Sequence, residues 1–422
     1  MNKKPLAEMT PEEKAEFRAE ALRRYYEFCE RKLHVDMSRG KPSKEQLDIS
    51  DRMLTELQDG ADCISNDGFD CRSYGNPAGV RDCRELFANL LHVDVGNIIA
   101  CGNSSLSLIY DFLSQCMTHG AGSTPWSKLD EVKFIAIVPG YDRHFAMAQH
   151  FGIKMINSKM TPTGPNMDEI EELIKDPSVK GMFCVPKYSN PDGVTYDAET
   201  CERLAAMKPA AEDFRVIWDN AYCVHDLYED RHDHLRNIFK LARKYGTQDH
   251  FIEFSSTSKI TFPGSGVSVI AASERNVEMI LNRMHYQTIS YDKLNQLRHV
   301  KVFGNVAGIK LQMKRHAAIL RPKFEAVEQI FEEELGGLGI AHWSKPVGGY
   351  FISLEVTGGS ATTVGTLCQD AGLTLTKVGA TYPYGYDPDD SNIRVAPTYP
   401  PLDELKISAE LLAVAVKIAC SE

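Results

Sequence analysis

Short apolar runs alternate with helical segments along the middle of the chain. Each run is rich in β-branched or aromatic residues and ends in a polar turn. The runs occupy residues 132–141, 182–193, 214–222, 251–259 and 266–273. Helical stretches such as 168–176 and 197–207 separate most of them. Because strands and helices alternate, we predict an α/β fold with a mainly parallel central sheet, helices on both faces and right-handed crossovers.

The pattern changes near the end of this alternation. Helical periodicity takes over from about residue 290 to about residue 334, and strand-like segments follow at 349–356, 373–379 and 391–398. We interpret this tail as a smaller α+β domain. At the other end, Thr10 and Pro11 are typical of a helix start. We therefore expect three parts, namely an N-terminal helix and arm that belong to the small domain (1–62), a large domain (63–300) and a small C-terminal domain (301–422).

Composition and charge exclude several classes of protein. The chain has 422 residues and a formal net charge of −11, which gives no general attraction for nucleic acid or anionic lipid. It has no run of eighteen apolar residues, and its first thirty residues lack the apolar core of a signal peptide. The 11 cysteines form no C-x-x-C pair, which favours free thiols over disulfides or zinc. We expect a cytoplasmic protein without a bound metal ion.

Polar residues gather where the apolar runs end. Tyr141, Asn190, Asp219 with Tyr222, and Lys259 each follow such a run directly. In an open parallel sheet, the loops at the carboxyl ends of the strands meet in one crevice, and ligands bind there. We therefore expect these residues to form one site, although they span more than a hundred positions.

Lys259 is the central candidate, in the stretch 254-FSSTSKITFPGSG-266. A lysine amine is a nucleophile only when it is deprotonated, and burial lowers its pKa. One interpretation is a Schiff-base lysine, and the other is an ordinary surface lysine. Ser256 and Ser258 could serve a ligand or simply satisfy the backbone of a turn.

Asp219 ends a run that should be a buried strand, where a carboxylate is costly unless it is paired. It could cap a helix or form a salt bridge, or it could face a protonated heterocycle nitrogen and so stabilise a carbanion. Tyr222 could donate a hydrogen bond to a phenolate oxygen or be an aromatic rim residue. Asn190 lies in N-P-D-G, which is a strong turn sequence in any protein.

Two further sites could bind anions. Ser104 and Ser105 precede a helical stretch, where hydroxyl and backbone N–H groups can hold a phosphate or simply cap the helix. Arg394 lies inside a strand-like segment. It could be a solvated edge residue or a bidentate clamp for a carboxylate.

Taken together, these motifs have a recognisable order. The order G-N-S-S, P-G-Y, N-P-D-G, D-N-A-Y, S-x-S-K and R-V-A-P-T resembles the class I aminotransferases, the pyridoxal-phosphate enzymes of fold type I. The resemblance runs from about Ser38 to the end and looks closest to a divergent subgroup of aspartate aminotransferases. It implies pyridoxal 5′-phosphate as the cofactor, the fold type I architecture, and a homodimer with active sites at the interface.

The resemblance also implies roles around the cofactor ring. Lys259 would form the Schiff base and later move the proton between the α-carbon and C4′. Asp219 would pair with the pyridine nitrogen. Asn190 and Tyr222 would hydrogen-bond the ring oxygen O3′, and Tyr141 would stack on the ring face.

Further roles concern the phosphate and the substrate. Four serines would hold the phosphate, namely Ser104, Ser105, Ser256 and Ser258. Tyr74 matches the tyrosine that reaches the phosphate of the neighbouring subunit. Gly40 and Arg394 would receive the α-carboxylate of the substrate, and Asn190 also borders it.

One departure concerns the phosphate site. The family usually has an arginine shortly after the lysine, whereas Gly266 and Val267 stand here. A charge-assisted contact of about 1.5–3 kcal/mol is then absent or comes from elsewhere. The serines could carry more of the phosphate, or another cation could replace the arginine. The candidates are Arg39, Arg72 and Arg143.

We predict a ping-pong transaminase that moves the amino group of aspartate to 2-oxoglutarate, largely by resemblance. A dicarboxylate needs a second cation, for which Lys41, Arg39 and Arg143 are candidates. Fold does not fix function, so alternatives stay open. They are transamination of aromatic or branched-chain substrates, a lyase, a decarboxylase, or a non-catalytic regulatory relative.

Overall fold

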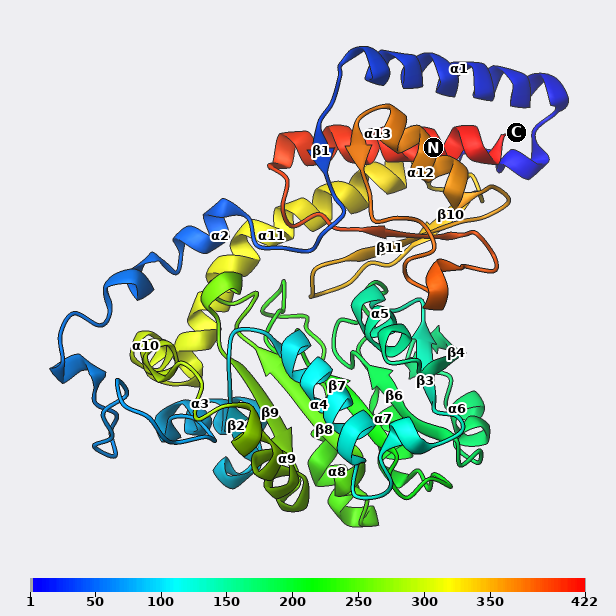
Figure 1. The fold of residues 1–422 in the computed structure, drawn as a ribbon. Coiled ribbons are helices and arrows are strands. Elements are labelled where there is room, and N and C mark those ends of the chain that lie inside the picture. The colour runs from blue at the N-terminus through cyan, green and yellow to red at the C-terminus, as the bar shows by residue number, and fades with distance from the viewer. Residues whose placement is uncertain (1–2, 422) are drawn as a thin grey trace.

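The computed structural model describes residues 3–421 and is built around one large sheet (Figure 1). Met1 and Asn2, which begin the segment searched for a signal peptide, and Glu422 lie outside the described residues. The sheet contains β2 (Ile98–Ala100), β3 (Lys133–Val138), β4 (Lys154–Thr161), β5 (Gly164–Pro165), β6 (Val179–Cys184), β7 (Arg215–Asp219), β8 (Phe251–Ser256) and β9 (Ser268–Ala272). Their order is β2-β9-β8-β7-β6-β3-β4-β5, and the five central strands β8 to β4 are parallel.

The five predicted strands of the middle region are all present, as β3, β6, β7, β8 and β9. β9 runs antiparallel to β8, because the connection between the two strands, residues 257–267, contains only a short 3-10 helix and no crossover α-helix. β2, β4 and β5 were not predicted. β4 was missed because polar residues interrupt its apolar positions in Lys154–Thr161.

Helices cover both faces of the sheet, as predicted. One face packs against α3 (Arg81–Leu91), α6 (Met167–Leu173), α7 (Ala198–Ala206), α8 (Ile238–Tyr245) and α10 (Lys293–Phe303). The other packs against α4 (Ser105–His119), α5 (Asp142–His150) and α9 (Glu274–Gln287). Neighbouring residues of one strand, such as Ile217 and Trp218 of β7, lie in these opposite cores because successive side chains alternate across a sheet.

A smaller α+β part lies beside the large sheet. Its strands β10 (Ala341–Trp343), β11 (Ile352–Val356) and β13 (Asn392–Val395) form an antiparallel sheet. Its helices include α12 (Ala361–Asp370) and α13 (Leu402–Cys420). The strand expected at 373–379 is only β12 (Leu373–Thr374), which pairs in parallel with β1 (Val35–Asp36). This pairing ties the N-terminal segment to the C-terminal part.

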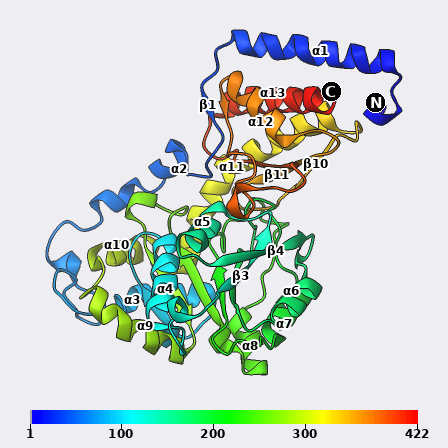
Figure 2. The ribbon, with the colours of Figure 1, turned by 45° about the vertical axis from the view of Figure 1, so that its right-hand side comes forward.

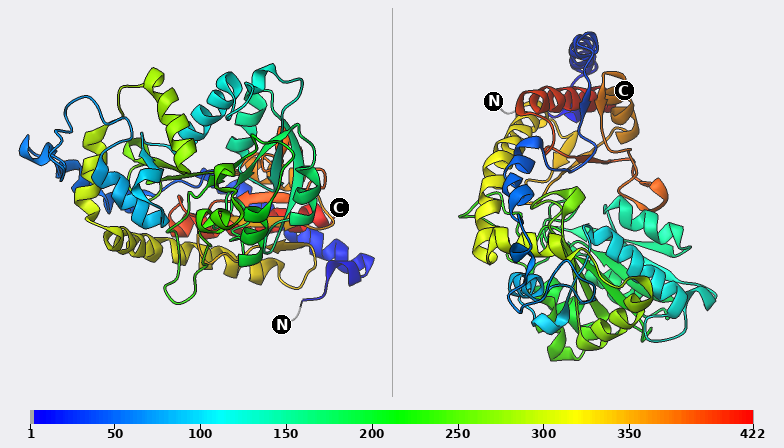
Figure 3. Two further views of the ribbon diagram at one scale, coloured as in Figure 1. Left: turned by 90° about the horizontal axis from the view of Figure 1, so that it is seen from below. Right: turned by 60° about the vertical axis from the view of Figure 1, so that its left-hand side comes forward.

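The helix α11 (Val306–Leu335) runs from one part to the other (Figures 1 and 3). Ile309 and Met313, near its start, belong to a core of the large sheet. Leu320 and Phe324, further along, belong to the core of the smaller part. The division of the chain at residues 62 and 300 stays a prediction. Across residues 3–421, every helix is too short or too polar to span a lipid bilayer.

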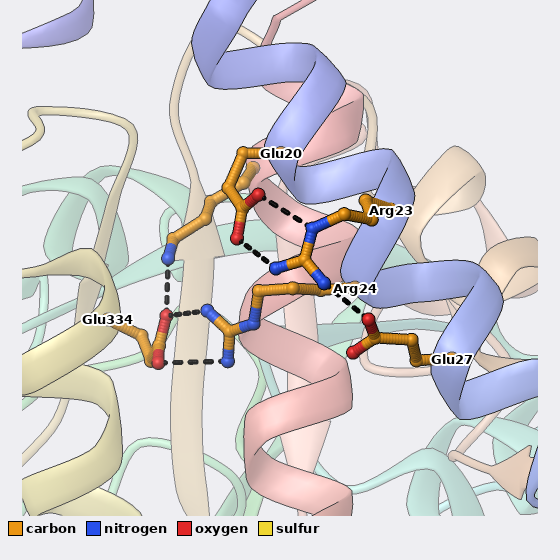
Figure 4. Close-up of polar contacts among 6 residues, drawn as sticks. Glu20, Arg23, Arg24, Glu27 and Glu334 are labelled. Atoms are coloured by element: carbon orange, nitrogen blue, oxygen red, sulfur yellow. Dashed lines mark hydrogen bonds and ion pairs between the residues drawn. The ribbon is translucent and has the colours of Figure 1, made fainter.

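The N-terminal helix α1 (Pro11–Glu30) packs along α13 at the outer edge of the smaller part (Figure 2). It starts with a capping box, in which Thr10 and Glu13 bond to each other's backbone N–H groups. Between α1 and α11, Arg24 donates to both carboxylate oxygens of Glu334, over 2.8 and 3.1 Å (Figure 4). Lys417 of α13 also bonds to Glu334. These contacts join three helices.

Replacing Glu334 with glutamine should lower the free energy of unfolding by about 2–3 kcal/mol at pH 7. Burial raises the pKa of Glu334, but the bonds from Arg24 and Lys417 outweigh it and bring the pKa to about 2. The stabilisation is therefore present above the usual glutamate pKa and is lost as the pH falls toward 2. Chemical denaturation at pH 7 and pH 3 measures this difference.

Glu20→Gln is the matched control for Glu334→Gln, because Glu20 also pairs with an arginine of α1 but is half exposed (Figure 4). We expect Glu20→Gln to change the unfolding free energy much less than Glu334→Gln does, because solvent screens an exposed ion pair. Equal effects of the two substitutions would contradict a special role for the bridge at Glu334.

Candidate active site

The predicted site residues meet at the carboxyl ends of the central strands. Asp219 is the last residue of β7, Lys259 follows β8, and Asn190 follows β6. Tyr141 follows β3 and directly precedes α5. Arg394 reaches the same place from β13 of the smaller part, where its Nη1 lies 3.3 Å from Oδ1 of Asn190. The structure thus brings residues from five separate segments together.

The side-chain amine of Lys259 lies near two aromatic rings. Its Nζ lies 5.1 Å from the ring centre of Tyr222 and 5.8 Å from that of Tyr350. Burial lowers the pKa of Lys259, while the charge of Asp219 acts in the opposite direction. The amine therefore loses its proton more easily than that of a solvated lysine, as a nucleophile requires. This environment is not that of a surface lysine.

Asp219 is buried, and only one of its two carboxylate oxygens has a hydrogen-bond partner among the described residues. Its Oδ2 lies 3.0 Å from Nε2 of His144, whose ring stacks on Phe183 at 4.9 Å with an interplanar angle of 13°. Its Oδ1 has no hydrogen-bond partner among the described residues. A buried acceptor without a partner is costly, so this oxygen is suited to a donor from a ligand. The sequence did not point to His144, although it lies one helical turn after Tyr141.

Burial also affects the tyrosines of the site. It raises the pKa of Tyr141 to about 12, and the nearby carboxylates of Asp219 and Asp142 act in the same direction. Tyr222 is buried as well, and burial raises its pKa above the usual value. Both phenols therefore stay protonated near neutral pH and can donate hydrogen bonds.

Two serine loops adjoin the N-terminus of α4. Ser104 is the N-cap residue of α4 and its side chain makes no capping bond, so ordinary capping does not explain it. Ser258 donates its hydroxyl to the carbonyl of Asn103 over 3.1 Å, and Ser256 donates to Ser258 over 3.1 Å. Ser105 is the buried first residue of the helix. Hydroxyls and free backbone N–H groups at a helix N-terminus can hold a phosphate.

The position of the missing arginine is closed by packing. A Cβ atom on Gly266 would lie 3.0 Å from Oγ1 of Thr257 and 3.3 Å from the carbonyl of Asn103. Val267 is fully buried. Of the three proposed replacements, Arg72 pairs with Asp70 at 2.6 Å. The other two, Arg39 and Arg143, are exposed. None of these arginines has a contact with another described residue that would identify it as the replacement.

Arg394 is buried, with only 6% of its side chain exposed, so the interpretation as a solvated edge residue is wrong. Its guanidinium lies 5.1 Å from the ring centre of Phe351. Gly40 lies against the same ring, where a Cβ atom would come within 2.4 Å of Cζ. Gly40 therefore allows the chain to pass close to the Phe351 ring that lies beside Arg394.

Two predicted residues have other surroundings. The Nζ of Lys41 lies 3.7 Å from the ring centre of Tyr399, so its ammonium is held by an aromatic face. Tyr74 is 78% exposed. A cavity of about 630 Å³ lies elsewhere, between α11 and the loop after β7, and none of the predicted site residues lines it. The residues at the strand ends, and not this cavity, carry the chemistry described above.

The fold is that of the fold type I aminotransferases. The chain belongs to the aspartate aminotransferase family, since the family model described as "Aspartate amino-transferase" matches residues 9–422. The aspartate aminotransferase of Corynebacterium glutamicum is 42% identical over 408 residues, which cover 96% of this chain and 94% of the relative. The predicted fold and aminotransferase activity are confirmed.

Two solved structures support the same assignment. That of an aspartate transaminase from C. glutamicum has a TM-score of 0.96 and 41% identity, and covers 99% of this chain and 98% of its own. That of a putative aminotransferase from Corynebacterium diphtheriae has a TM-score of 0.92 and 44% identity, and covers 95% of this chain and 99% of its own. The similarity therefore extends over nearly the whole chain.

Proposed function

We propose that this aminotransferase uses pyridoxal 5′-phosphate to move the amino group of aspartate to 2-oxoglutarate in a ping-pong reaction. One observation carries the cofactor assignment. The buried Oδ1 of Asp219 has no hydrogen-bond partner within residues 3–421, and a lysine of lowered pKa lies near it. A protonated ring nitrogen would satisfy that oxygen, and the lysine amine would meet the aldehyde. The aminotransferase family also implies this cofactor.

The residues of the site fit the parts of the cofactor. Asp219 would hold the ring nitrogen, and Asn190 and Tyr222 would hydrogen-bond the ring oxygen. Tyr141 would lie on the ring face. Four serines and the N-terminus of α4 would hold the phosphate, namely Ser104, Ser105, Ser256 and Ser258. Because packing closes the position of the usual arginine, hydroxyl and backbone donors would carry more of this contact.

When bound, pyridoxal phosphate supplies an aldehyde that condenses with amines and a ring that withdraws electrons from the substrate α-carbon. In its neutral form, the Lys259 amine removes the proton from that carbon. Asp219 keeps a positive charge on the ring nitrogen. Arg394, beside Gly40, binds the α-carboxylate and so orients the substrate.

The reaction is proposed to take place in a homodimer with active sites at the interface. Tyr74, which would reach the neighbouring subunit's phosphate, is largely exposed within one chain. The segment around residues 50–60 projects from the body of the molecule (Figures 1 and 3), and Leu54 in it is 67% exposed. An exposed apolar side chain on a projecting segment is suited to a subunit contact. The proposed location is the cytoplasm.

The preference for aspartate follows the named relatives of the family. The side-chain carboxylate of a dicarboxylic substrate would need a second cation, for which we keep Lys41, Arg39 and Arg143. Lys41 is the most restrained of these, because of its contact with Tyr399. Its backbone carbonyl also accepts a bond from Thr398, which follows β13.

A single-turnover experiment tests the proposal. Aspartate is added to the cofactor-loaded protein without an acceptor, and oxaloacetate and the visible spectrum are followed. We expect one oxaloacetate per site, together with loss of the visible absorption band of the cofactor-loaded protein. Addition of 2-oxoglutarate should restore that band. Release of carbon dioxide or ammonia without oxaloacetate would instead indicate a decarboxylase or a lyase.

A further inference from the structure

An ion pair occupies the proposed carboxylate site. Nη1 of Arg394 lies 2.7 Å from Oδ1 of Asp142. Asp142 is the first residue of α5 in the large part, whereas Arg394 lies on β13 in the smaller part. The pair therefore links the two parts of the chain across the site. It uses the arginine that we propose for the substrate α-carboxylate.

The contact engages only part of the guanidinium. Among the described residues, Nη1 of Arg394 bonds to Asp142 and Asn190, and Nε bonds to Thr376 over 3.2 Å. Nη2 has no hydrogen-bond partner among them, and Asp142 contributes one oxygen only. A substrate carboxylate could use two parallel N–H donors, which makes a stronger contact than a single bond. Exchange of Asp142 for the substrate is therefore favourable.

Asp142 can separate from Arg394 without becoming a buried, uncompensated charge. Its side chain is 31% exposed, whereas that of Arg394 is 6% exposed. Within the described part of the chain, its carboxylate bonds to no other side chain than Arg394. It also lies in the first turn of α5, where the helix dipole favours a negative charge. A released Asp142 would thus be stabilised by water and by the helix.

We propose that Asp142 is an internal competitor that weakens the binding of both substrates at Arg394. This inference rests on the proposed role of Arg394. A substrate binds only to the fraction of molecules in which the ion pair between Asp142 and Arg394 is broken. The apparent dissociation constant of the substrate rises accordingly. In a ping-pong reaction the donor and the acceptor use the same carboxylate site in turn. The competition therefore lowers the affinity for both and lets each product leave sooner.

Calorimetric titration of the cofactor-loaded enzyme with succinate, a dicarboxylate without an amino group, tests the proposal. Asp142→Asn should bind succinate about five-fold more tightly than the wild-type enzyme. KM for aspartate and for 2-oxoglutarate should fall by a similar factor. Asp130→Asn removes an exposed acid remote from the site and should leave all three values unchanged. Unchanged succinate binding by Asp142→Asn would overturn the proposal. Weaker binding would also overturn it and would make Asp142 a positioning residue for Arg394.

A second variant separates this proposal from the proposed function. Arg394→Lys keeps a positive charge but loses the fork of donors, so succinate binding should weaken at least about ten-fold. If Arg394→Lys binds succinate as the wild type does, Arg394 is not the carboxylate site and both proposals fail. If Arg394→Lys weakens binding and Asp142→Asn does not tighten it, only the role of Asp142 as a competitor fails.

Discussion

Replacing Lys259 with alanine should lower the transamination rate by at least about 10⁴-fold, the upper range of acid–base catalysis by one group. The amine at the end of β8 would be the nucleophile toward the cofactor and the base for the substrate α-proton, so one substitution removes both functions. The cofactor would still be held by Asp219 and the serines, but no longer covalently. Initial rates and the visible spectrum of the loaded protein measure the two effects.

Lys259→Arg is the matched variant. A guanidinium keeps the positive charge and much of the volume, but it does not lose its proton in proteins. We expect Lys259→Arg to be as inactive as Lys259→Ala, with the far-ultraviolet circular dichroism of both variants unchanged. Activity within about 100-fold of the wild type in either variant would rule out Lys259 as the amine of the reaction.

How far the sequence predicts this fold depends on the kind of strand. β3 and β7, which are buried on both faces, read as apolar runs and were predicted, whereas β4 mixes apolar and lysine positions and was missed. The pairing of β1 with β12 could not be predicted either. Each strand has only two residues, and more than three hundred positions separate them. Such pairing depends on the packing of the whole smaller part.

The candidate site divides in a similar way. Lys259 and Asp219 were predictable because a charged residue at the end of an apolar strand is unusual, and strand ends converge in a parallel sheet. His144 and Asp142 were not predicted. Both lie in the first turn of α5, where an acidic or polar residue needs no functional explanation. Their partners, Asp219 and Arg394, become adjacent to them only in the folded chain.

Replacing Asp219 with asparagine should lower kcat by about 10²–10³-fold, the usual effect of removing one electrostatic stabiliser of the transition state. Asparagine can still accept the bond from His144, so the packing around Phe183 should persist. It carries no negative charge to keep a proton on the ring nitrogen. Steady-state kinetics should therefore show a fall in kcat with a smaller change in KM for aspartate.

Asp219→Asn should lower the activity without lowering the stability of the folded protein. One buried oxygen of Asp219 has no hydrogen-bond partner in the described part of the chain, and a neutral amide at this position avoids burying a charge. The thermal midpoint of cofactor-free Asp219→Asn should then equal or exceed that of the wild type, while its activity is far lower. Asp219→Glu, which keeps the charge on a longer side chain, should retain more activity than Asp219→Asn. If Asp219→Asn instead unfolds at a clearly lower temperature, the carboxylate is a structural element of the core, and its loss of activity cannot be assigned to the ring nitrogen.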